Sequence, residues 1–322
     1  MASLLSVENL QVQFQTKKGI NTAVDGVSFS VEKGRILGIV GESGCGKSVT
    51  SMSILQLLGS NARISGGSIK LDGKELIGLP EKEMCRIRGN DIAMIFQDPM
   101  TALNPTLTIG TQLMEPIMLH QNCGKKEAWT RAVDVLKRVG IAAPEKRMKE
   151  YPHQLSGGMR QRVMIAMAVS CEPRLLIADE PTTALDVTIQ AQILELMCEL
   201  REKMGPAIML ITHDMGVVAE TADDVLVLYA GKAVEYGSIE DIFERPKHPY
   251  TQGLLNSIPR LDEDVELLNT IEGTVPAPDA MPAGCRFAPR CPYGKDRCMK
   301  EKPGVYHAGN SLVSCFRYEG EK

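Results

Sequence analysis

The 322-residue sequence has no long hydrophobic run, and this absence bears first on its relation to a membrane. Its apolar stretches, such as Ile208 to Ile211 and Val225 to Leu228, have the length of a β-strand. A membrane-spanning helix needs about 18 to 20 apolar residues. The N-terminal residues Met1 to Glu8 contain neither a basic segment nor a long apolar one, so they do not resemble an export signal. We therefore expect a cytoplasmic chain that does not itself cross a membrane.

The sequence also lacks a strong excess of charge of either sign. Lysine and arginine total 36, aspartate and glutamate total 40, and the formal net charge is −4. Acidic and basic residues are interleaved, whereas a protein that binds the backbone of nucleic acid carries a basic stripe. We therefore expect no nucleic acid partner. The hydrophobic fraction of 43% is close to the average for globular proteins, which predicts a compact fold.

The hydrophobic pattern changes several times along the chain. Apolar and polar residues alternate from Leu5 to Val31 around turn signals at Lys18-Gly19 and Asp25-Gly26, which predicts antiparallel strands. Asp72-Gly73 predicts the turn of a β-hairpin. A helical period follows between about residues 98 and 155, and buried-strand runs such as Leu175 to Ala178 come after it. This order predicts an α/β core with an antiparallel β subdomain and a helical subdomain insert.

The composition changes again after about residue 245, where proline, arginine and cysteine become frequent. We predict a small loop-rich C-terminal domain in residues 246–322, separate from the α/β core in residues 1–245.

Residues Gly41 to Ser48 have the sequence GESGCGKS and match G-x-x-x-x-G-K-[ST], the pattern of phosphate-binding loops. They follow the apolar run Arg35 to Val40, which predicts a buried strand, and they precede a predicted helix, as this motif requires. Glycines allow successive backbone N–H groups to point inward at phosphate oxygens. Lys47 would meet the β- and γ-phosphates, and Ser48 would offer its hydroxyl to Mg²⁺. The loop predicts ATP binding.

Polar residues follow three other strand-like runs. Asp179 and Glu180 end the run that begins at Leu175; Asp179 suits a metal carboxylate, and Glu180 suits a general base beside the γ-phosphate. Gln97 and His213 each follow an apolar run as well. Because open α/β sheets bind ligands at the carboxyl ends of parallel strands, we expect these residues at the same site.

Ser156, Gly157 and Gly158 open a predicted amphipathic helix that leads toward Asp179. Ser156 is a suitable helix cap, and Ser-Gly-Gly at a helix N-terminus is also an anion site. A chain with one complete phosphate loop and one such half-site favours a dimer, in which the half-site of each subunit covers the nucleotide of the other.

Four of the nine cysteines lie in the C-terminal segment, at Cys285, Cys291, Cys298 and Cys315. A reducing cytoplasm disfavours a disulfide framework, so these four are candidate metal ligands. Structural zinc usually uses closely spaced C-x2-4-C pairs, which these cysteines do not form, whereas their wider spacing and Cys291-Pro292 favour an iron–sulfur cluster. Zinc and four unligated thiols are the alternatives.

The order of these motifs resembles that of the nucleotide-binding subunits of ATP-binding cassette (ABC) transporters. The motifs are Gly41–Ser48, Gln97, Leu155-Ser156-Gly157-Gly158, Leu175–Glu180, Ala184-Leu185-Asp186 and His213. The resemblance covers about residues 5 to 245 and implies the ABC ATPase form of the P-loop NTPase fold. It also implies that two subunits hold two ATP molecules between the phosphate loop of one and the Ser-Gly-Gly segment of the other.

The resemblance further implies roles for single residues. Gln97 would serve the metal, the attacking water and the coupling to the transporter, and His213 would contact the γ-phosphate. Asp186 would communicate across the dimer, and Phe14 would stack on adenine, with Phe29 as the alternative. The predicted set comprises catalytic Glu180, His213 and Gln97; nucleotide-binding Gly41, Ser43, Gly44, Cys45, Gly46, Lys47, Ser48, Val49, Phe14, Ser156, Gly157, Gly158 and Asp186; and magnesium ligands Ser48, Gln97 and Asp179.

Two local features narrow the resemblance to peptide importers. The segment Arg245 to Thr251 and the cysteine-bearing tail are similar to the C-terminal extension of dipeptide and oligopeptide importers, as are Gly41 to Gly44 and Asn104 to Thr108. That family implies an ATPase that powers peptide uptake from the cytoplasmic face of the membrane, and a [4Fe–4S] cluster at the four cysteines. It implies as partners a second ATPase subunit, identical or different, two permease subunits and an extracytoplasmic peptide-binding protein. The alternatives are an importer of nickel or another small solute, and a soluble ABC ATPase outside transport.

Overall fold

The structure is a computed structural model that describes residues 3–17, 19–183, 185–258 and 270–320. Lys18, part of a predicted turn, and Ala184, part of the motif before Asp186, lie outside these residues. The chain forms two compact units. The first consists mainly of Gly78–Ile211, and the second consists of Leu5–Val31, Ile36–Ile77 and the part of the chain from Thr212 onward.

Three parallel strands form the centre of the first unit. They are β6 (Ile92–Ile95), β7 (Leu175–Asp179) and β8 (Ala207–Ile211). β7 lies in the middle, where Leu176 pairs with Ala93 of β6 and with Ile208 of β8. Every residue of β7 and β8 is buried, which explains why both strands are continuous apolar runs in the sequence.

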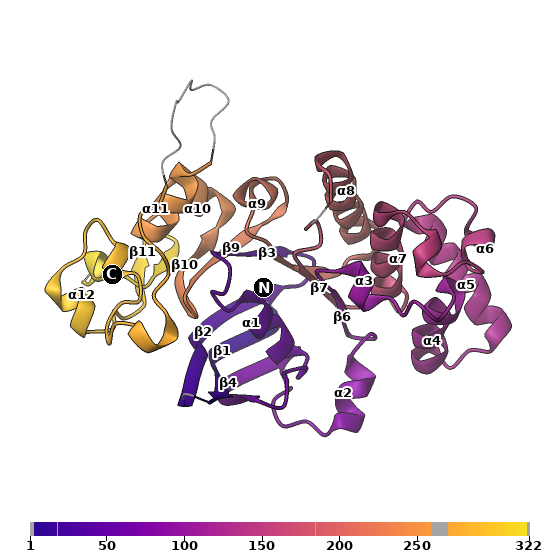
Figure 1. The fold of residues 1–322 in the computed structure, drawn as a ribbon, viewed down its shortest axis with the longest axis horizontal. Helices are drawn as coiled ribbons and strands as arrows, with labels where there is room; N and C mark the ends of the chain where they lie inside the picture. The colour runs from indigo at the N-terminus through magenta and orange to yellow at the C-terminus, as the bar shows by residue number, and fades with distance from the viewer. Residues whose placement is uncertain (1–2, 18, 184, 259–269, 321–322) are drawn as a thin grey trace. The chain divides into compact units, whose positions relative to one another are not determined.

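Helices make up most of the rest of the first unit. They are α2 (Glu81–Ile87), α3 (Pro99–Ala102), α4 (Ile109–Gln121), α5 (Lys125–Arg138), α6 (Pro144–Arg147), the 3₁₀ helix η1 (Pro152–Gln154), α7 (Gly157–Val169) and α8 (Val187–Met204). Helices α4, α5 and α7 pack against one another (Figure 1). α5 buries Ala128, Ala132 and Leu136 on one face. The helical pattern that the sequence predicts between about residues 98 and 155 is confirmed in α3 to α6.

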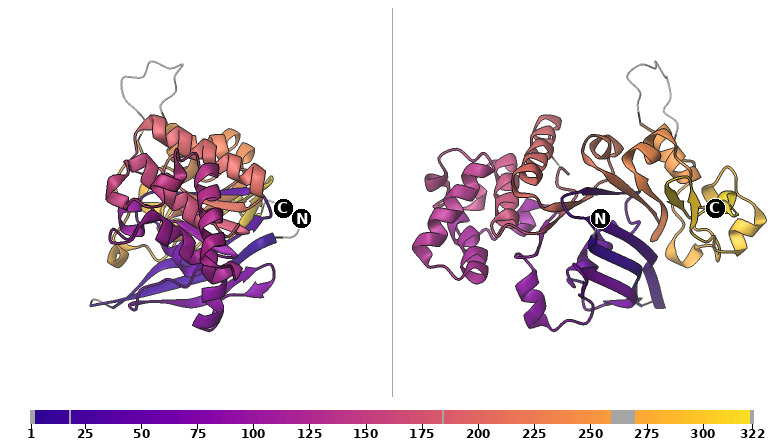
Figure 2. Two further views of the ribbon diagram at one scale, coloured as in Figure 1. Left: turned by 90° about the vertical axis from the view of Figure 1, so that its right-hand side faces the viewer. Right: turned by 180° about the vertical axis from the view of Figure 1, so that it is seen from behind.

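A four-stranded sheet in the second unit confirms the predicted antiparallel β subdomain (Figure 2). Its strands, in the order β2-β1-β4-β5, are β2 (Gly19–Glu32), β1 (Ser3–Thr16), β4 (Ala62–Leu71) and β5 (Lys74–Glu75). β2 continues through Asp25-Gly26, so the turn predicted there is wrong. Asp72 and Gly73 connect β4 to β5 with φ angles of 49° and 82°. Two positive φ angles are the signature of a type I′ turn, so the predicted hairpin is confirmed.

Five further strands of the second unit form a sheet in the order β11-β12-β10-β9-β3. They are β3 (Ile36–Val40), β9 (Asp224–Tyr229), β10 (Lys232–Ser238), β11 (Tyr306–Ala308) and β12 (Ser311–Val313). β3 and β9 are parallel, and the other neighbours are antiparallel. Tyr236 of β10 pairs with Leu226 of β9 and with Leu312 of β12. The C-terminal segment therefore extends the sheet to which β3 belongs (Figures 1 and 2).

Short helices complete the second unit. They are α1 (Lys47–Ile54), α9 (Met215–Thr221), α10 (Ile239–Glu244), α11 (Pro249–Asn256), α12 (Asp296–Lys300) and the 3₁₀ helices η2 (Pro278–Ala280), η3 (Ala288–Arg290) and η4 (Phe316–Tyr318). Among the described residues of both units, no helix combines the length and apolar character that a bilayer crossing requires.

A buried aromatic cluster joins the C-terminal segment to the sheet of the second unit. The ring of Tyr229 in β9 lies 4.7 Å from that of Tyr250 in α11 and 5.1 Å from that of Phe287, between ring centroids. All three side chains are at most 2% exposed. Burying one large aromatic or aliphatic side chain contributes about 1.5–3 kcal/mol, so this cluster is a substantial part of the packing of the C-terminal segment.

We expect Ser238→Ala to lower the free energy of unfolding by about 1 kcal/mol, the usual value of an N-cap. Ser238 Oγ accepts the N–H of Asp241 at 3.2 Å and caps α10, and alanine leaves that N–H without its acceptor. Urea unfolding of the purified chain measures the change. Ser238→Thr keeps a capping hydroxyl and is expected to lose much less. Equal losses for the two variants would contradict the role of the cap.

Candidate functional site

The loop Gly41–Ser48 connects β3 with α1 in the second unit, which confirms the predicted strand–loop–helix context. Two glycines let the backbone pass close to its neighbours. Gly41 has a φ of 153°, and a Cβ there would lie 2.1 Å from the carbonyl oxygen of Leu228 in β9. Gly46 has a φ of 103°, and its Cβ would lie 3.0 Å from the carbonyl oxygen of Ala23. A residue with a side chain would therefore be strained and crowded at both positions.

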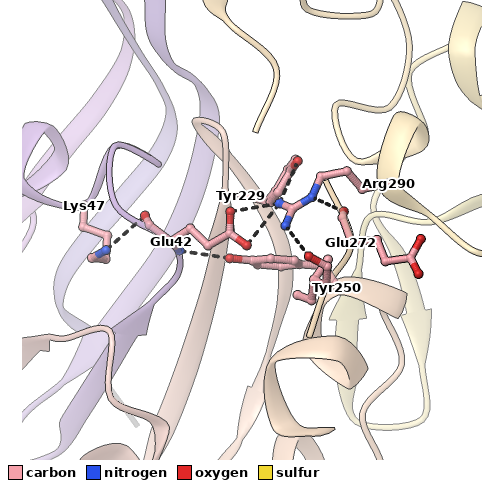
Figure 3. A network of polar contacts seen from close by, with 7 residues as sticks. Glu42, Lys47, Tyr229, Tyr250, Glu272 and Arg290 are labelled. Carbon is pink, nitrogen blue, oxygen red and sulfur yellow. Dashed lines mark hydrogen bonds and ion pairs between the residues drawn. The ribbon is translucent and has the colours of Figure 1, made fainter. Parts of the chain in front are cut away.

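Lys47 lies in the first turn of α1 and is only 5% exposed. Its Nζ donates to the carbonyl oxygen of Gly41 at 2.7 Å. It also donates to the carbonyl oxygen of Glu42 at 3.2 Å (Figure 3). These acceptors are neutral, and an ammonium group forms stronger hydrogen bonds with charged phosphate oxygens. Ser43 and Ser48 are exposed, so the outer side of the loop is open to a ligand. The loop is thus suited to bind phosphate groups.

The predicted catalytic residues of the first unit meet at the end of β7. Asp179 is the last residue of this strand and is 5% exposed. Glu180 follows with a φ of 46°, a left-handed conformation that few residues other than glycine adopt and that is enriched at functional sites. Gln97 Nε2 donates to Glu180 Oε2 at 3.0 Å. The structure therefore brings Gln97 and Glu180 together.

Thr183 also belongs to this site, although no sequence motif predicts it. Its Oγ1 donates to the same Oε2 atom of Glu180 at 2.9 Å. Together with Gln97, it gives the carboxylate two hydrogen bonds that fix its orientation. The signal in the sequence is slight, because it consists of a hydroxyl residue three positions after a glutamate.

The Ser-Gly-Gly segment and Asp186 lie at the N-termini of two helices of the first unit. The side chain of Ser156 caps α7, and Oδ1 of Asp186 caps α8. A Cβ at Gly158 would lie 3.2 Å from Cγ2 of Ile189 in the first turn of α8, whereas a Cβ at Gly157 would meet nothing within 4 Å. The two helix starts are therefore packed together, and Gly157 faces open space.

His213 and Phe14 lie in the second unit with the phosphate loop. His213 is exposed and directly precedes Asp214, which caps α9 by accepting the N–H of Gly216 at 2.8 Å. Phe14 is half-buried in β1, whereas Phe29 is only 5% exposed in β2. A ring that stacks on adenine must present one face, so Phe14 is better placed for this role than Phe29.

Glu42 of the phosphate loop is held by residues far away in the sequence. Its carboxylate oxygens accept hydrogen bonds from Arg290 Nη1 at 2.9 and 3.1 Å, and its N–H donates to Tyr250 Oη at 2.9 Å (Figure 3). The side chain of Arg290 is 6% exposed. This network has no signal in the sequence, because Arg290 follows Glu42 by 248 positions and no local pattern connects them.

The four C-terminal cysteines line one cavity of about 80 Å³ in the second unit, together with His248 and Phe287. Burial raises the pKa of the Cys285 thiol to about 11, and it also raises the pKa values of Cys291 and Cys315. Such thiols are protonated near neutral pH unless a metal binds the thiolate form. Within the part of the chain that the structure describes, no three or more His, Cys, Asp and Glu side chains are arranged to hold a metal ion.

Comparison with protein families matches two parts of the chain. The family model described as "ABC transporter" matches residues 24–183. The model described as "Oligopeptide/dipeptide transporter, C-terminal region" matches residues 234–298. The fold and the phosphate loop thus define an ATPase of the ABC transporter class.

Individual relatives narrow this class. The chain is 56% identical over 323 residues to the oligopeptide transport ATP-binding protein AppD of Bacillus subtilis, covering 100% of this chain and 98% of AppD. It is 51% identical over 315 residues to the oligopeptide transport ATP-binding protein OppD of Escherichia coli, covering 98% and 93%. This chain belongs to the family of oligopeptide and dipeptide transport ATP-binding proteins.

A solved structure agrees with the fold. The ATP-binding cassette MJ0796, a dimer in a post-hydrolysis state bound to ADP and Pi, is 27% identical with a TM-score of 0.66. The match covers 73% of this chain and 98% of that chain. The predicted ABC ATPase fold is therefore confirmed.

We expect Gly41→Ala to reduce ATP hydrolysis by on the order of 100-fold, as a displacement of about 1 Å at an active site does. The new Cβ collides with the Leu228 carbonyl oxygen, so β3 and the loop must move. The assay is phosphate release, with fluorescent-nucleotide binding beside it. Gly34→Ala is the matched control, because Gly34 has a φ of 71° but nothing within 4 Å of its Cβ position. Similar losses for both variants would mean that backbone strain, and not this contact, sets the requirement.

Proposed function

We propose that this chain hydrolyses ATP to drive the import of dipeptides and oligopeptides through an ABC transporter. The observation that carries this proposal is that one compact unit contains both the phosphate loop and a C-terminal segment of the peptide-transporter type. Relatives whose names give them a role in oligopeptide or dipeptide transport are similar over almost the whole chain. The C-terminal match favours peptide import over import of nickel and over a role outside transport.

The phosphate loop binds ATP. Its backbone N–H groups, Lys47 and the N-terminus of α1 bind the phosphates, while Val49 and Phe14 complete the nucleotide site, with Phe14 against adenine. Ser48, Gln97 and Asp179 supply hydroxyl, amide and carboxylate oxygens, which is the hard-ligand set that suits Mg²⁺. When bound, Mg²⁺ neutralises negative charge on the phosphates.

Glu180 acts as the general base in ATP hydrolysis. Its carboxylate accepts a proton from the water that attacks the γ-phosphorus, and ADP leaves on the opposite side. The hydrogen bonds from Gln97 and Thr183 hold the carboxylate in one orientation, so it does not have to be ordered during the reaction. His213 contacts the γ-phosphate and stabilises the charge that develops there.

The complete ATP site requires a second ATPase subunit. Ser156, Gly157 and Gly158 cover the nucleotide of the partner, and Asp186 contacts the opposite subunit. Gly157 suits this role because it faces open space at the start of α7. ATP then joins the two subunits, and hydrolysis releases them.

The remaining partners are the permease subunits in the membrane and a peptide-binding protein outside the cytoplasm. The partners include two permease subunits, and the helical insert, about 98–155, carries the surface that receives a coupling helix from these membrane-spanning subunits. The chain is then peripheral on the cytoplasmic face of the membrane. An extracytoplasmic peptide-binding protein delivers the substrate. We assign residues 1–245 to the nucleotide-binding domain and residues 246–322 to the C-terminal extension.

We propose that the four C-terminal cysteines hold a [4Fe–4S] cluster with a structural role. The four thiols line one cavity, and the segment that carries them contains only short helices and strands. A single zinc ion would need all four sulfur atoms at about 2.3 Å from one point. The four cysteines do not form the closely spaced C-x2-4-C pairs typical of structural zinc, and this spacing favours the larger cluster over zinc.

We expect Glu180→Gln to lower ATP turnover by at least about 100-fold, since a general base contributes that much or more. Glutamine keeps the shape of the side chain and an acceptor for Gln97 and Thr183, so ATP binding and the closed dimer persist. Phosphate release and retention of labelled ATP measure the two effects. Glu195→Gln, an exposed position on α8, is the control and keeps parental turnover. Normal turnover in Glu180→Gln would remove Glu180 as the base.

We expect anaerobically purified protein to contain about four iron atoms and four acid-labile sulfides per chain, with the absorption of a [4Fe–4S] cluster. Cys298→Ser is expected to lose most of both, because one ligand is missing. Cys85→Ser, at an exposed position in α2, is the control and keeps them. One zinc per chain without iron would identify the alternative metal. A folded protein without either metal would refute both.

A further inference from the structure

The ion pair between Arg290, whose side chain is 6% exposed, and Glu42, which is half-buried, belongs to none of the roles described above. Glu42 lies inside the phosphate loop, and the carbonyl oxygen of the same residue accepts a hydrogen bond from Lys47. Its carboxylate therefore lies in the segment that has to bind the negatively charged phosphates of ATP. A carboxylate at that place repels the ligand unless a cation neutralises it.

We propose that Arg290 is a positioning residue for the phosphate loop, which neutralises Glu42 and holds the loop in its nucleotide-binding shape. The guanidinium is well suited to this role because it is fixed from several sides. Nε donates to the carbonyl oxygen of Glu272 at 3.0 Å, Nη2 to that of Ile271 at 3.2 Å, and Nη1 to the hydroxyl of Tyr229 at 3.4 Å (Figure 3). The remaining contacts of Nη1 go to the carboxylate of Glu42.

The backbone of Glu42 is fixed as well as its side chain. Its N–H donates to Tyr250 Oη, and its carbonyl oxygen accepts from Lys47 Nζ. Tyr250 is completely buried, and burial raises the pKa of its hydroxyl, so the phenol stays protonated and accepts through a lone pair. Tyr250 and Arg290 thus hold the peptide group and the side chain of the same loop residue. Both come from the chain beyond residue 245.

Arg290 also links the phosphate loop to the cysteine cavity. It ends η3 and directly precedes Cys291, which lines that cavity. Phe287 lines the same cavity, and its ring centroid lies 5.4 Å from that of Tyr250. A group that binds the four cysteines would therefore fix both residues that contact Glu42. This second step rests on the proposed cluster, whereas the role of Arg290 does not.

The first test is a double-mutant cycle on the full chain, with ATP affinity measured by displacement of a fluorescent ATP analogue. Arg290→Gln is expected to weaken ATP binding roughly tenfold, within the usual range for coupled sites, and to raise KM much more than it lowers kcat. Adding Glu42→Gln removes the unpaired charge and is expected to restore most of the affinity. Arg290→Lys keeps the charge and is expected to lie between Arg290→Gln and the parent.

A matched control variant and two substitute variants keep this test decisive. Arg297→Gln removes an arginine of the same segment whose ion pairs, with Glu301 and Glu319, are exposed, and it keeps parental affinity. If Arg290→Gln does not fold, the double variant and Arg290→Lys carry the comparison. Parental affinity in Arg290→Gln would overturn the proposal. A double variant as weak as Arg290→Gln would also overturn it, because a purely structural anchor is not rescued by removing the charge of Glu42.

The second test compares metal-loaded and chelator-stripped protein. Stripping is expected to weaken ATP binding several-fold in the parent, within the usual size of such couplings, and to have little further effect in the Glu42→Gln/Arg290→Gln double variant. Equal losses in both proteins would contradict a coupling through Arg290. A preparation without bound metal would refute the cluster and this second step, but it would leave the result of the double-mutant cycle unchanged.

Discussion

The phosphate loop depends on a close backbone approach at Gly41. β3 and β9 are parallel, and Val40 with Val227 is their last pair. The chain leaves the sheet at the next residue, Gly41. Gly41 has a φ of 153°, and its backbone passes so close to the carbonyl oxygen of Leu228 that a Cβ does not fit between them. This turn decides the direction of the loop and the start of α1, and therefore where Lys47 and the N–H groups point. The ability of the loop to bind phosphate therefore depends on the close approach of the Gly41 backbone to the Leu228 backbone.

The features that the sequence predicts well are those decided by residues close together in the chain. The phosphate loop, the Asp72-Gly73 turn and the helix cap Ser156 each follow from the conformational preferences of a few neighbouring residues. The buried strand β7 is equally plain, because it is apolar without interruption. Such signals predicted the class of fold and the positions at which polar side chains leave the strands.

Contacts between distant parts of the chain could not be predicted in this way. β11 and β12 are three residues each, too short for an alternating pattern to specify which strand they join. Arg290 is one arginine in a segment rich in arginine, and only its burial shows that it needs a partner, since an unpaired buried charge is costly. The left-handed backbone of Glu180 is similarly invisible, because glutamate gives no local signal for a positive φ.

The carboxylate of Glu42 has two opposite effects, and Arg290 decides between them. A charge-assisted hydrogen bond anchors the loop more firmly than a neutral one, which favours glutamate at this position. The same charge opposes phosphate binding when it has no counter-charge. The loop therefore gains from Glu42 only after the C-terminal segment has folded onto it. Since Arg290 is synthesised 248 residues after Glu42, the nucleotide site reaches its final charge only when nearly the whole chain has been made.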